Sequence, residues 1–235
     1  MEQQPQSIMI AFEGIDGSGK SVQFKRLKAC LEAAGVDVGV MDFPCYDSFF
    51  GEEIGKMLSG RFDRTAANVD VYSMCLWYAM DRWAAFQQHQ PGKRQVVLLN
   101  RSTMANAAYQ ATRCSEEAAQ QLIPWIYKLE YEILKIPMPD LFFIFDVPVA
   151  TSRANVAKKG HRDYIGEDAD VYERDNRFLE QVRRRYLSCA DYFPNVRLLA
   201  CADENGVMYS EKAIGDQVLA EIRMKFPHIL PEACT

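Results

Sequence analysis

The chain has 235 residues, of which 49% are hydrophobic and 25% charged, a composition typical of a globular protein. This length suits one sizeable α/β domain, so we expect residues 1–235 to form a single domain. The net charge of −5 disfavours a general nucleic-acid binder. No apolar run reaches the length of a membrane span and the N-terminus has no secretory pattern, so we expect a cytoplasmic protein without a membrane partner.

The cysteines carry no Cys-x-x-Cys spacing, so we expect no metal site built on them. Their odd number and wide spread predict free thiols in a reducing compartment. They are Cys30, Cys45, Cys75, Cys114, Cys189, Cys201 and Cys234.

Apolar runs alternate with helical stretches, which predicts a doubly wound parallel sheet with helices on both faces. The expected strands are residues 8–12, 38–43, 96–100, 141–147 and 196–200. The expected helices lie near residues 20–34, 52–58, 69–88, 115–135, 149–159, 171–190 and 210–225. Pro124 interrupts the fourth of these, which predicts a kink or two shorter helices there.

The first strand leads into a segment that fits the phosphate-binding pattern G-x-x-x-x-G-K-[ST] in full, Gly14-Ile15-Asp16-Gly17-Ser18-Gly19-Lys20-Ser21. Its glycines let consecutive backbone N–H groups point at an anion, and the following helix adds partial positive charge. We expect this loop, together with Val22, to bind the phosphates of a nucleoside triphosphate. Lys20 would reach the β- and γ-phosphates, and the Ser21 hydroxyl would ligate Mg²⁺.

Other sequence features narrow the class of P-loop protein. The chain contains no Asn-Lys-x-Asp, the tetrapeptide that reads guanine in GTPases, and no strand ends in the Asp-Glu pair of motor ATPases. These absences favour a kinase that phosphorylates a small molecule.

Residues 158–170 are polar, contain glycines and are flanked by helices. Such a composition is typical of a solvated loop, but its basic residues in a P-loop chain favour a lid that closes over phosphates. We place this lid at about residues 153–170.

The chain resembles thymidylate kinase, the P-loop nucleoside monophosphate kinase that phosphorylates dTMP, over nearly its whole length. The resemblance rests on the order and spacing of six segments: residues 12–21, Phe43-Pro44, Tyr78-Ala79-Met80-Asp81-Arg82-Trp83, Asn100-Arg101, Ala108-Tyr109-Gln110 and Asp170-Val171-Tyr172-Glu173-Arg174-Asp175. It implies a P-loop fold with a five-stranded parallel sheet, ATP and Mg²⁺ as cofactors, and a homodimer.

The resemblance also implies roles for five residues around the acceptor. Asp16 would accept a hydrogen bond from the 3′-hydroxyl, and Phe43 would wall the acceptor site. Tyr78 would stack on thymine and Arg82 would read its O4. Arg101 would hold the acceptor phosphate with its planar fork of donors. The sequence leaves open a turn-forming Asp16, a core-packed Phe43 and an ordinary helix surface at Tyr78 and Arg82.

Further residues fall at family positions of polar or aromatic contact. Asn106 and Gln110 would contact the base, Tyr172 would close over the deoxyribose, and Glu173 would support the Mg²⁺ or acceptor shell. A plain surface-helix role remains open for each.

Family members place a catalytic arginine either in the P-loop or in the lid. Because Gly17 occupies the P-loop position, we expect the charge to come from the lid, where Arg153 and Arg162 are preferred over Lys158 and Lys159. Such an arginine neutralises charge on the transferring phosphoryl group.

One position departs from the family pattern, since Asn100 stands where the family has the aspartate of Asp-Arg. Its neutral amide cannot supply the carboxylate that helps hold the metal and its waters. Three interpretations remain open: Glu13 or Glu173 supplies the charge, the enzyme is slow, or the chain binds nucleotides with weak catalysis.

We therefore predict a phosphotransferase that moves the γ-phosphoryl group of Mg-ATP to dTMP, giving dTDP. A kinase of another nucleoside monophosphate or of a deoxynucleoside is the alternative among enzymes. A nucleotide-binding relative with weak catalysis is the alternative outside them. The expected partners are small-molecule substrates and a second copy of the chain, with no nucleic acid.

Overall fold

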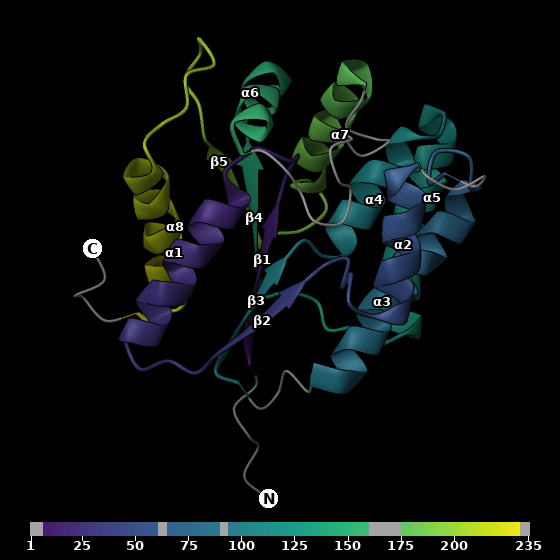
Figure 1. Ribbon diagram of the computed structural model, residues 1–235. Helices are drawn as coiled ribbons and strands as arrows, with labels where there is room; N and C mark the ends of the chain where they lie inside the picture. The colour runs from purple at the N-terminus through teal and green to yellow at the C-terminus, as the bar shows by residue number, and fades with distance from the viewer. Residues whose placement is uncertain (1–6, 61–64, 90–93, 160–174, 231–235) are drawn as a thin grey trace, which may run out of the picture.

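A five-stranded parallel sheet forms the centre of the computed structural model, which describes residues 7–60, 65–89, 94–159 and 175–230 (Figure 1). The strand order is β2-β3-β1-β4-β5. This sheet confirms the predicted fold class, and the strands are β1 (Ile8–Glu13), β2 (Val38–Asp42), β3 (Val96–Asn100), β4 (Leu141–Asp146) and β5 (Val196–Ala200). Because the chain winds outward from β1 in both directions, ligands are expected at the carboxyl ends of the central strands.

Helices cover both faces of the sheet (Figure 1). One face carries α1 (Lys20–Ala33) and α8 (Glu211–Lys225), which pack on each other. The opposite face carries α3 (Val71–His89), α4 (Thr103–Thr112), α5 (Glu116–Tyr127) and α7 (Asn176–Cys189). Two further helices are α2 (Phe49–Ser59), which packs on α3, and α6 (Val149–Lys159), which follows β4.

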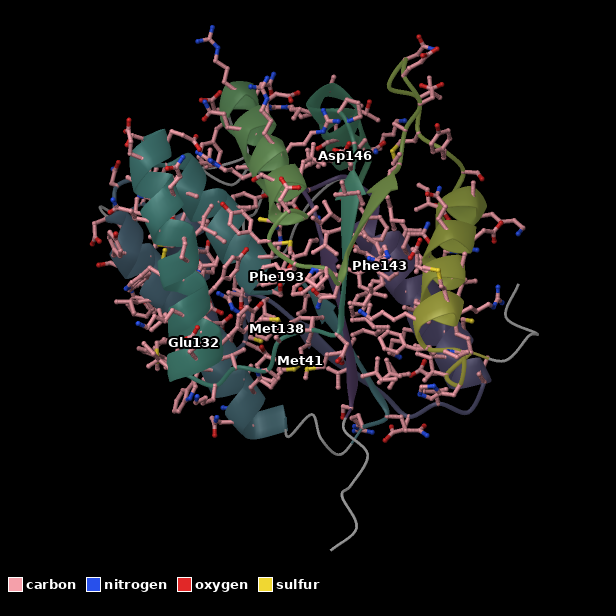
Figure 2. The ribbon with its side chains drawn as sticks, turned by 180° about the vertical axis from the view of Figure 1, so that it is seen from behind. Met41, Glu132, Met138, Phe143, Asp146 and Phe193 are labelled. Carbon is pink, nitrogen blue, oxygen red and sulfur yellow. The ribbon has the colours of Figure 1, made fainter. Side chains whose placement is uncertain are left out.

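The central strands alternate their side chains between two hydrophobic cores. Phe143 of β4 packs on the side of α1 and α8, whereas its neighbour Phe142 faces the other core and stacks on Phe193 with ring centroids 5.9 Å apart (Figure 2). Both strand residues are fully buried. Burial of such a side chain stabilises the fold by about 1.5–3 kcal/mol. The sheet is thereby held on both faces.

Asp146 ends β4 and fixes α7 at this edge of the sheet (Figure 2). Its two carboxylate oxygens accept hydrogen bonds from Nε and Nη2 of Arg183, at 2.6 and 2.9 Å. This bidentate geometry is stronger and more directional than a single contact.

The helix α4 was not predicted from the sequence. Eight of its ten residues are buried because it packs between α3, α5 and α7. The helix is short and four of its ten residues are alanine, so few large apolar side chains mark a helical period in the sequence. Its start does carry a sequence signal, since the Ser102 hydroxyl caps it by accepting a hydrogen bond from the Met104 amide.

The stretch expected as one interrupted helix contains two consecutive helices, as the Pro124 interpretation allowed. The junction, however, falls at Lys128 and not at the proline. Pro124 lies inside α5, and a π-helix, η2 (Lys128–Ile133), follows directly. Proline lacks one backbone N–H, and the neighbouring packing tolerates that single lost hydrogen bond.

The expectation of free thiols holds for five described cysteines, Cys45, Cys75, Cys114, Cys189 and Cys201. It is wrong for Cys30, which is disulfide-bonded. Pairing depends on the distance between residues in the fold, which cysteine spacing alone does not give. Within the described ranges, no helix is both long and apolar enough to cross a membrane.

Candidate active site

The loop between β1 and α1 has the backbone of an anion-binding nest. Gly14, Gly17 and Gly19 have φ angles of 130°, 78° and 95°, a region that other residues rarely adopt. A Cβ atom on Gly17 would lie 2.2 Å from the carbonyl oxygen of Ser152. Only glycine therefore fits at this position without displacing α6.

Lys20 begins α1 and curls back over the loop. Its Nζ donates hydrogen bonds to the carbonyl oxygens of Gly14 and Ile15, both at 2.8 Å, and its side chain is buried. No side chain caps the start of α1, where Gly19 is the N-cap residue, so the helix end keeps its attraction for anions. The exposed Ser21 and the partly buried Val22 complete this turn. The predicted phosphate-binding residues thus form one continuous cradle.

The helix α6 supports this loop from the side. Ser152 donates a hydrogen bond from Oγ to the carbonyl oxygen of Asp16, and Asn155 donates from Nδ2 to that of Gly17 at 2.9 Å. Neither residue was predicted from the sequence, although their spacing of three places them on one face of a helix.

Asp16 and Arg101 form an ion pair beside the loop, with Nη2 of the arginine 2.9 Å from Oδ1 of the aspartate. Arg101 also donates to the hydroxyl of Tyr186 at 3.2 Å and lies over the ring of Tyr109, 5.2 Å from its centroid. Burial opposes the charge of this guanidinium, yet the Asp16 carboxylate raises the pKa of Arg101 well above its ordinary value. Arg101 is therefore a cation held at the edge of the phosphate-binding loop.

Asn100 and Asp42 end adjacent strands and are hydrogen-bonded to each other, Asn100 Nδ2 donating to Asp42 Oδ1 at 2.8 Å. Glu13, at the end of β1, is fully buried and accepts a hydrogen bond from the Ser102 hydroxyl at 2.5 Å. Burial raises the pKa of Glu13, which disfavours its charged form. This placement weakens the interpretation in which Glu13 supplies the charge that Asn100 lacks.

A buried carboxylate, Glu130 in η2, accepts hydrogen bonds from several donors on α3 and α4. Arg82 binds it with Nε and Nη2, both at 2.6 Å, and Thr103 donates to it at 2.7 Å. Asn106 donates at 3.0 Å to Glu130 and at 3.1 Å to the backbone oxygen of Cys75. Two residues predicted to contact the base are thus tied to a residue that sequence reasoning missed.

The other residues predicted to surround the phosphoryl acceptor pack against or bind other side chains of the chain. Phe43 is buried, stacks on Phe86 and lies 6.0 Å from the guanidinium carbon of Arg82. Gln110 is fully buried and accepts a hydrogen bond from Arg113 at 2.7 Å. Tyr78 is half-buried against a cluster that contains Ile54, Leu58, Ala66 and Met74.

The profile of the thymidylate kinase family matches residues 12–207 of this chain. The chain belongs to the thymidylate kinase family. It is 32% identical to the thymidylate kinase of Mycobacterium tuberculosis strain H37Rv over 186 residues, which cover 78% of this chain and 86% of that protein. A probable thymidylate kinase of Methanobrevibacter smithii is also 32% identical, over 184 residues that cover 78% of this chain and 81% of that one.

A solved structure supports the fold. The thymidylate kinase from Candida albicans superposes with a TM-score of 0.71 over 94% of this chain and 92% of its own, at 19% sequence identity. The P-loop fold of the family is thus present in this chain.

The family's lid position is described only in part. Arg153, on α6, donates from Nη1 to Oδ1 of Asn176 at 2.5 Å, across to the start of α7. Lys158 is exposed near the end of α6. The side chain of Lys159 and the residues Arg162, Tyr172 and Glu173 lie outside the described part of the chain.

The oxygen donors around the loop fit a magnesium ion that arrives with a nucleotide. Ser21 is exposed at the start of α1, and the carboxylates of Asp16 and Asp42 lie at the same edge. No group of three or more His, Cys, Asp or Glu residues in the described ranges is arranged to hold a metal on its own. Magnesium commonly binds with phosphate oxygens, waters and only one or two protein ligands.

Proposed function

We propose that this chain transfers the γ-phosphoryl group of Mg-ATP to dTMP, giving dTDP. One observation carries the proposal: a complete phosphate-binding loop lies directly beside the Asp16–Arg101 pair in a member of the thymidylate kinase family. The loop is suited to the donor nucleotide, and the pair is suited to the phosphorylated acceptor. Both substrates then meet at the carboxyl edge of the sheet.

Binding and orientation account for most of the chemistry that the protein must supply. Phosphoryl transfer depends on positioning and on neutralising the charge of the transferring group. Lys20 exchanges its two carbonyl contacts for phosphate oxygens when the nucleotide binds. When bound, magnesium neutralises charge on the β- and γ-phosphates, and Ser21 is the hydroxyl that this loop offers to it.

The acceptor is held by the residues beside the loop. Arg101 keeps its positive charge when buried and can give two parallel donors to the acceptor phosphate. Asp16 accepts a hydrogen bond from the 3′-hydroxyl. Tyr78 stacks on thymine, and Arg82 and Asn106 complete the base site in positions that Glu130 fixes.

The lid supplies further positive charge near the transferring group. Arg153, Lys158, Lys159 and Arg162 are its basic residues, and Arg153 already bridges α6 and α7. Closure of such a lid excludes water and limits wasteful hydrolysis of ATP.

A homodimer is part of the proposal. The helix α3 exposes Tyr72, Leu76 and Trp83, with 48%, 43% and 36% of their surfaces accessible, and their spacing places them on one side of the helix. An apolar stripe of this kind is suited to pack against its copy around a two-fold axis. Light scattering should give the mass of a dimer for the parent and of a monomer for Leu76→Glu.

The experiment that tests the function is coupled ADP release with Mg-ATP against dTMP, dUMP, dCMP, dGMP and thymidine. Selective turnover of dTMP is expected, and the variant Lys20→Ala should lose it. Lys28→Ala, on an outward turn of the same helix, is the matched control and should keep it. Turnover of dTMP retained by Lys20→Ala would contradict the proposed kinase activity.

The alternative of nucleotide binding with weak catalysis rests on Asn100, which holds an amide at the end of β3. Calorimetry that finds tight binding of dTMP and ATP beside negligible turnover would favour it. Preference for another monophosphate or for thymidine in the same panel would instead correct the acceptor.

A further inference from the structure

The ends of β2 and β3 carry a carboxylate and an amide in direct contact. Asp42 and Asn100 are partners in the parallel register, and their side chains are joined at 2.8 Å. Asn100 ends the strand next to β1, and β1 leads into the phosphate-binding loop. In P-loop enzymes an aspartate beyond the loop helps to hold Mg²⁺ together with the loop serine or threonine. Here the amide stands next to the loop strand, and the carboxylate stands one strand further out.

The hydrogen bond fixes which way the amide points. An ionised carboxylate only accepts hydrogen bonds, so the Asn100 nitrogen must face Asp42. The amide oxygen of Asn100 is buried and has no hydrogen-bond partner among the residues that the structure describes. Asn100 therefore acts as a donor that orients the Asp42 carboxylate.

Asp42 also lies within the electrostatic field of the phosphate site. Burial raises the pKa of its carboxyl above the ordinary value, and the hydrogen bond from Asn100 and the positive charges of Arg101 and Lys20 offset only part of that rise. The residue is nevertheless exposed at the edge of the sheet. A carboxylate that is open to solvent at the same edge of the sheet as the phosphate-binding loop is well placed to bind metal-bound water.

The other described carboxylates at this edge are already engaged. Glu13 is fully buried and bound to Ser102, and burial favours its neutral form. Asp16 is paired with Arg101, and Asp146 with Arg183. Of these four carboxylates, Asp42 alone is both exposed and held by a neutral partner.

We propose that Asp42 is a metal-positioning residue that supplies, from the end of β2, the carboxylate charge that Asn100 does not provide at the end of β3. Asp42 would hold waters of the magnesium ion that accompanies ATP, and Asn100 would keep its side chain in place. This inference rests on the proposed function, because it presumes Mg-ATP in the loop.

The test exchanges the two side chains. Three variants are compared with the parent: Asp42→Asn, Asn100→Asp, and the double variant that carries both changes. Asp37→Asn is the matched control, because Asp37 precedes the same strand but pairs with Arg94 on the exposed surface. The readout is calorimetric binding of a non-hydrolysable ATP analogue, with magnesium and with EDTA, followed by turnover over a magnesium titration.

We expect the parent and Asp37→Asn to bind the analogue more tightly with magnesium. In Asp42→Asn, the gain in affinity for the analogue on adding magnesium should be about tenfold smaller, the equivalent of one charge-assisted contact. The affinity of this variant for the analogue in EDTA should be the same as that of the parent. The double variant restores a carboxylate to the pair and should recover most of the gain. A purely structural role for Asp42 would change binding in both conditions.

Two results would overturn the inference: an undiminished magnesium effect in Asp42→Asn, or a double variant no better than Asp42→Asn. Loss of the magnesium effect in Asp42→Asn with recovery in the double variant supports it even if dTMP is not the acceptor. The failure of the acceptor assignment would appear separately, as absent dTMP turnover in a parent that binds the analogue normally.

Discussion

Arg101 lies 2.9 Å from Asp16 across the edge of the phosphate-binding loop, so each residue neutralises the other before any substrate binds. The backbone of Arg101 has a φ of 67°, and its amide donates to the Phe12 carbonyl at 3.0 Å. The arginine is thus held at both its backbone and its guanidinium. Such a preorganised charge binds an anion without first losing side-chain freedom.

Arg101→Ala should raise the KM for dTMP by roughly 10- to 100-fold, because a hydrogen bond to a charged group contributes about 1.5–3 kcal/mol. Arg101→Lys keeps the charge but loses the planar fork, so its KM for dTMP should lie between that of the parent and that of Arg101→Ala. Steady-state kinetics checks both, with the KM for ATP as the internal control. An unchanged KM for dTMP in Arg101→Ala would refute the phosphate-binding role.

Glu13 should make stability depend on pH in the direction opposite to that of an ordinary ion-paired carboxylate. Burial raises its pKa in the folded chain above the ordinary value of 4.5, so the folded state holds a proton that the unfolded state releases. The stabilisation is fully present below the unfolded pKa and is lost as pH rises toward the folded pKa.

Glu13→Gln removes this titration while keeping a hydrogen-bond acceptor for Ser102. Urea unfolding from pH 4.5 upward should show the variant gaining stability relative to the parent as pH rises. A difference between variant and parent that is constant across this range would contradict the prediction.

All five strands and the phosphate-binding loop were predictable because each is determined by a pattern within a short stretch of sequence. Buried parallel strands appear as continuous apolar runs, and the loop needs its glycines at fixed spacing. Helix α4 was not predicted because it is short and four of its ten residues are alanine, which leaves few large apolar side chains to mark a helical period.

The contacts that organise the site could not be predicted in the same way. Arg82 and Glu130 are 48 positions apart, and Asn100 and Asp42 are 58 apart. Strand order and helix packing bring them together, and neither is visible in a single sequence. For this reason the sequence indicated a missing charge at Asn100 but not the carboxylate beside it.

The buried Arg82–Glu130 pair should be costly to break from one side. The side chains are 3% and 0% exposed, so Glu130→Gln leaves the arginine without its counter-charge. We expect a loss of about 3–5 kcal/mol in the free energy of unfolding, measured by urea denaturation. Glu116→Gln is the control, because it also removes an arginine partner, Arg185, but on the exposed surface where water replaces it. Equal shifts in the two unfolding midpoints would show that breaking the buried pair costs no more stability than breaking the exposed one.

Gly17→Ala should disable the phosphate-binding loop through backbone strain and through a clash of the added Cβ atom. Gly35→Ala has the strain without the clash, so the comparison separates the two effects. Both glycines have positive φ angles, 78° and 79°, so alanine is strained by about 1–2 kcal/mol at either position. Only at Gly17 does the added Cβ also meet a backbone oxygen, that of Ser152 at 2.2 Å, whereas nothing lies within 4 Å at Gly35.

Gly17→Ala must therefore push α6 and the loop apart, and its affinity for ATP should fall by about tenfold or more, the equivalent of one lost charge-assisted contact. Gly35→Ala should lose stability alone, and calorimetric titration with ATP beside urea unfolding distinguishes these outcomes. Equal ATP affinity in the two variants would mean that the contact with α6 does not shape the loop.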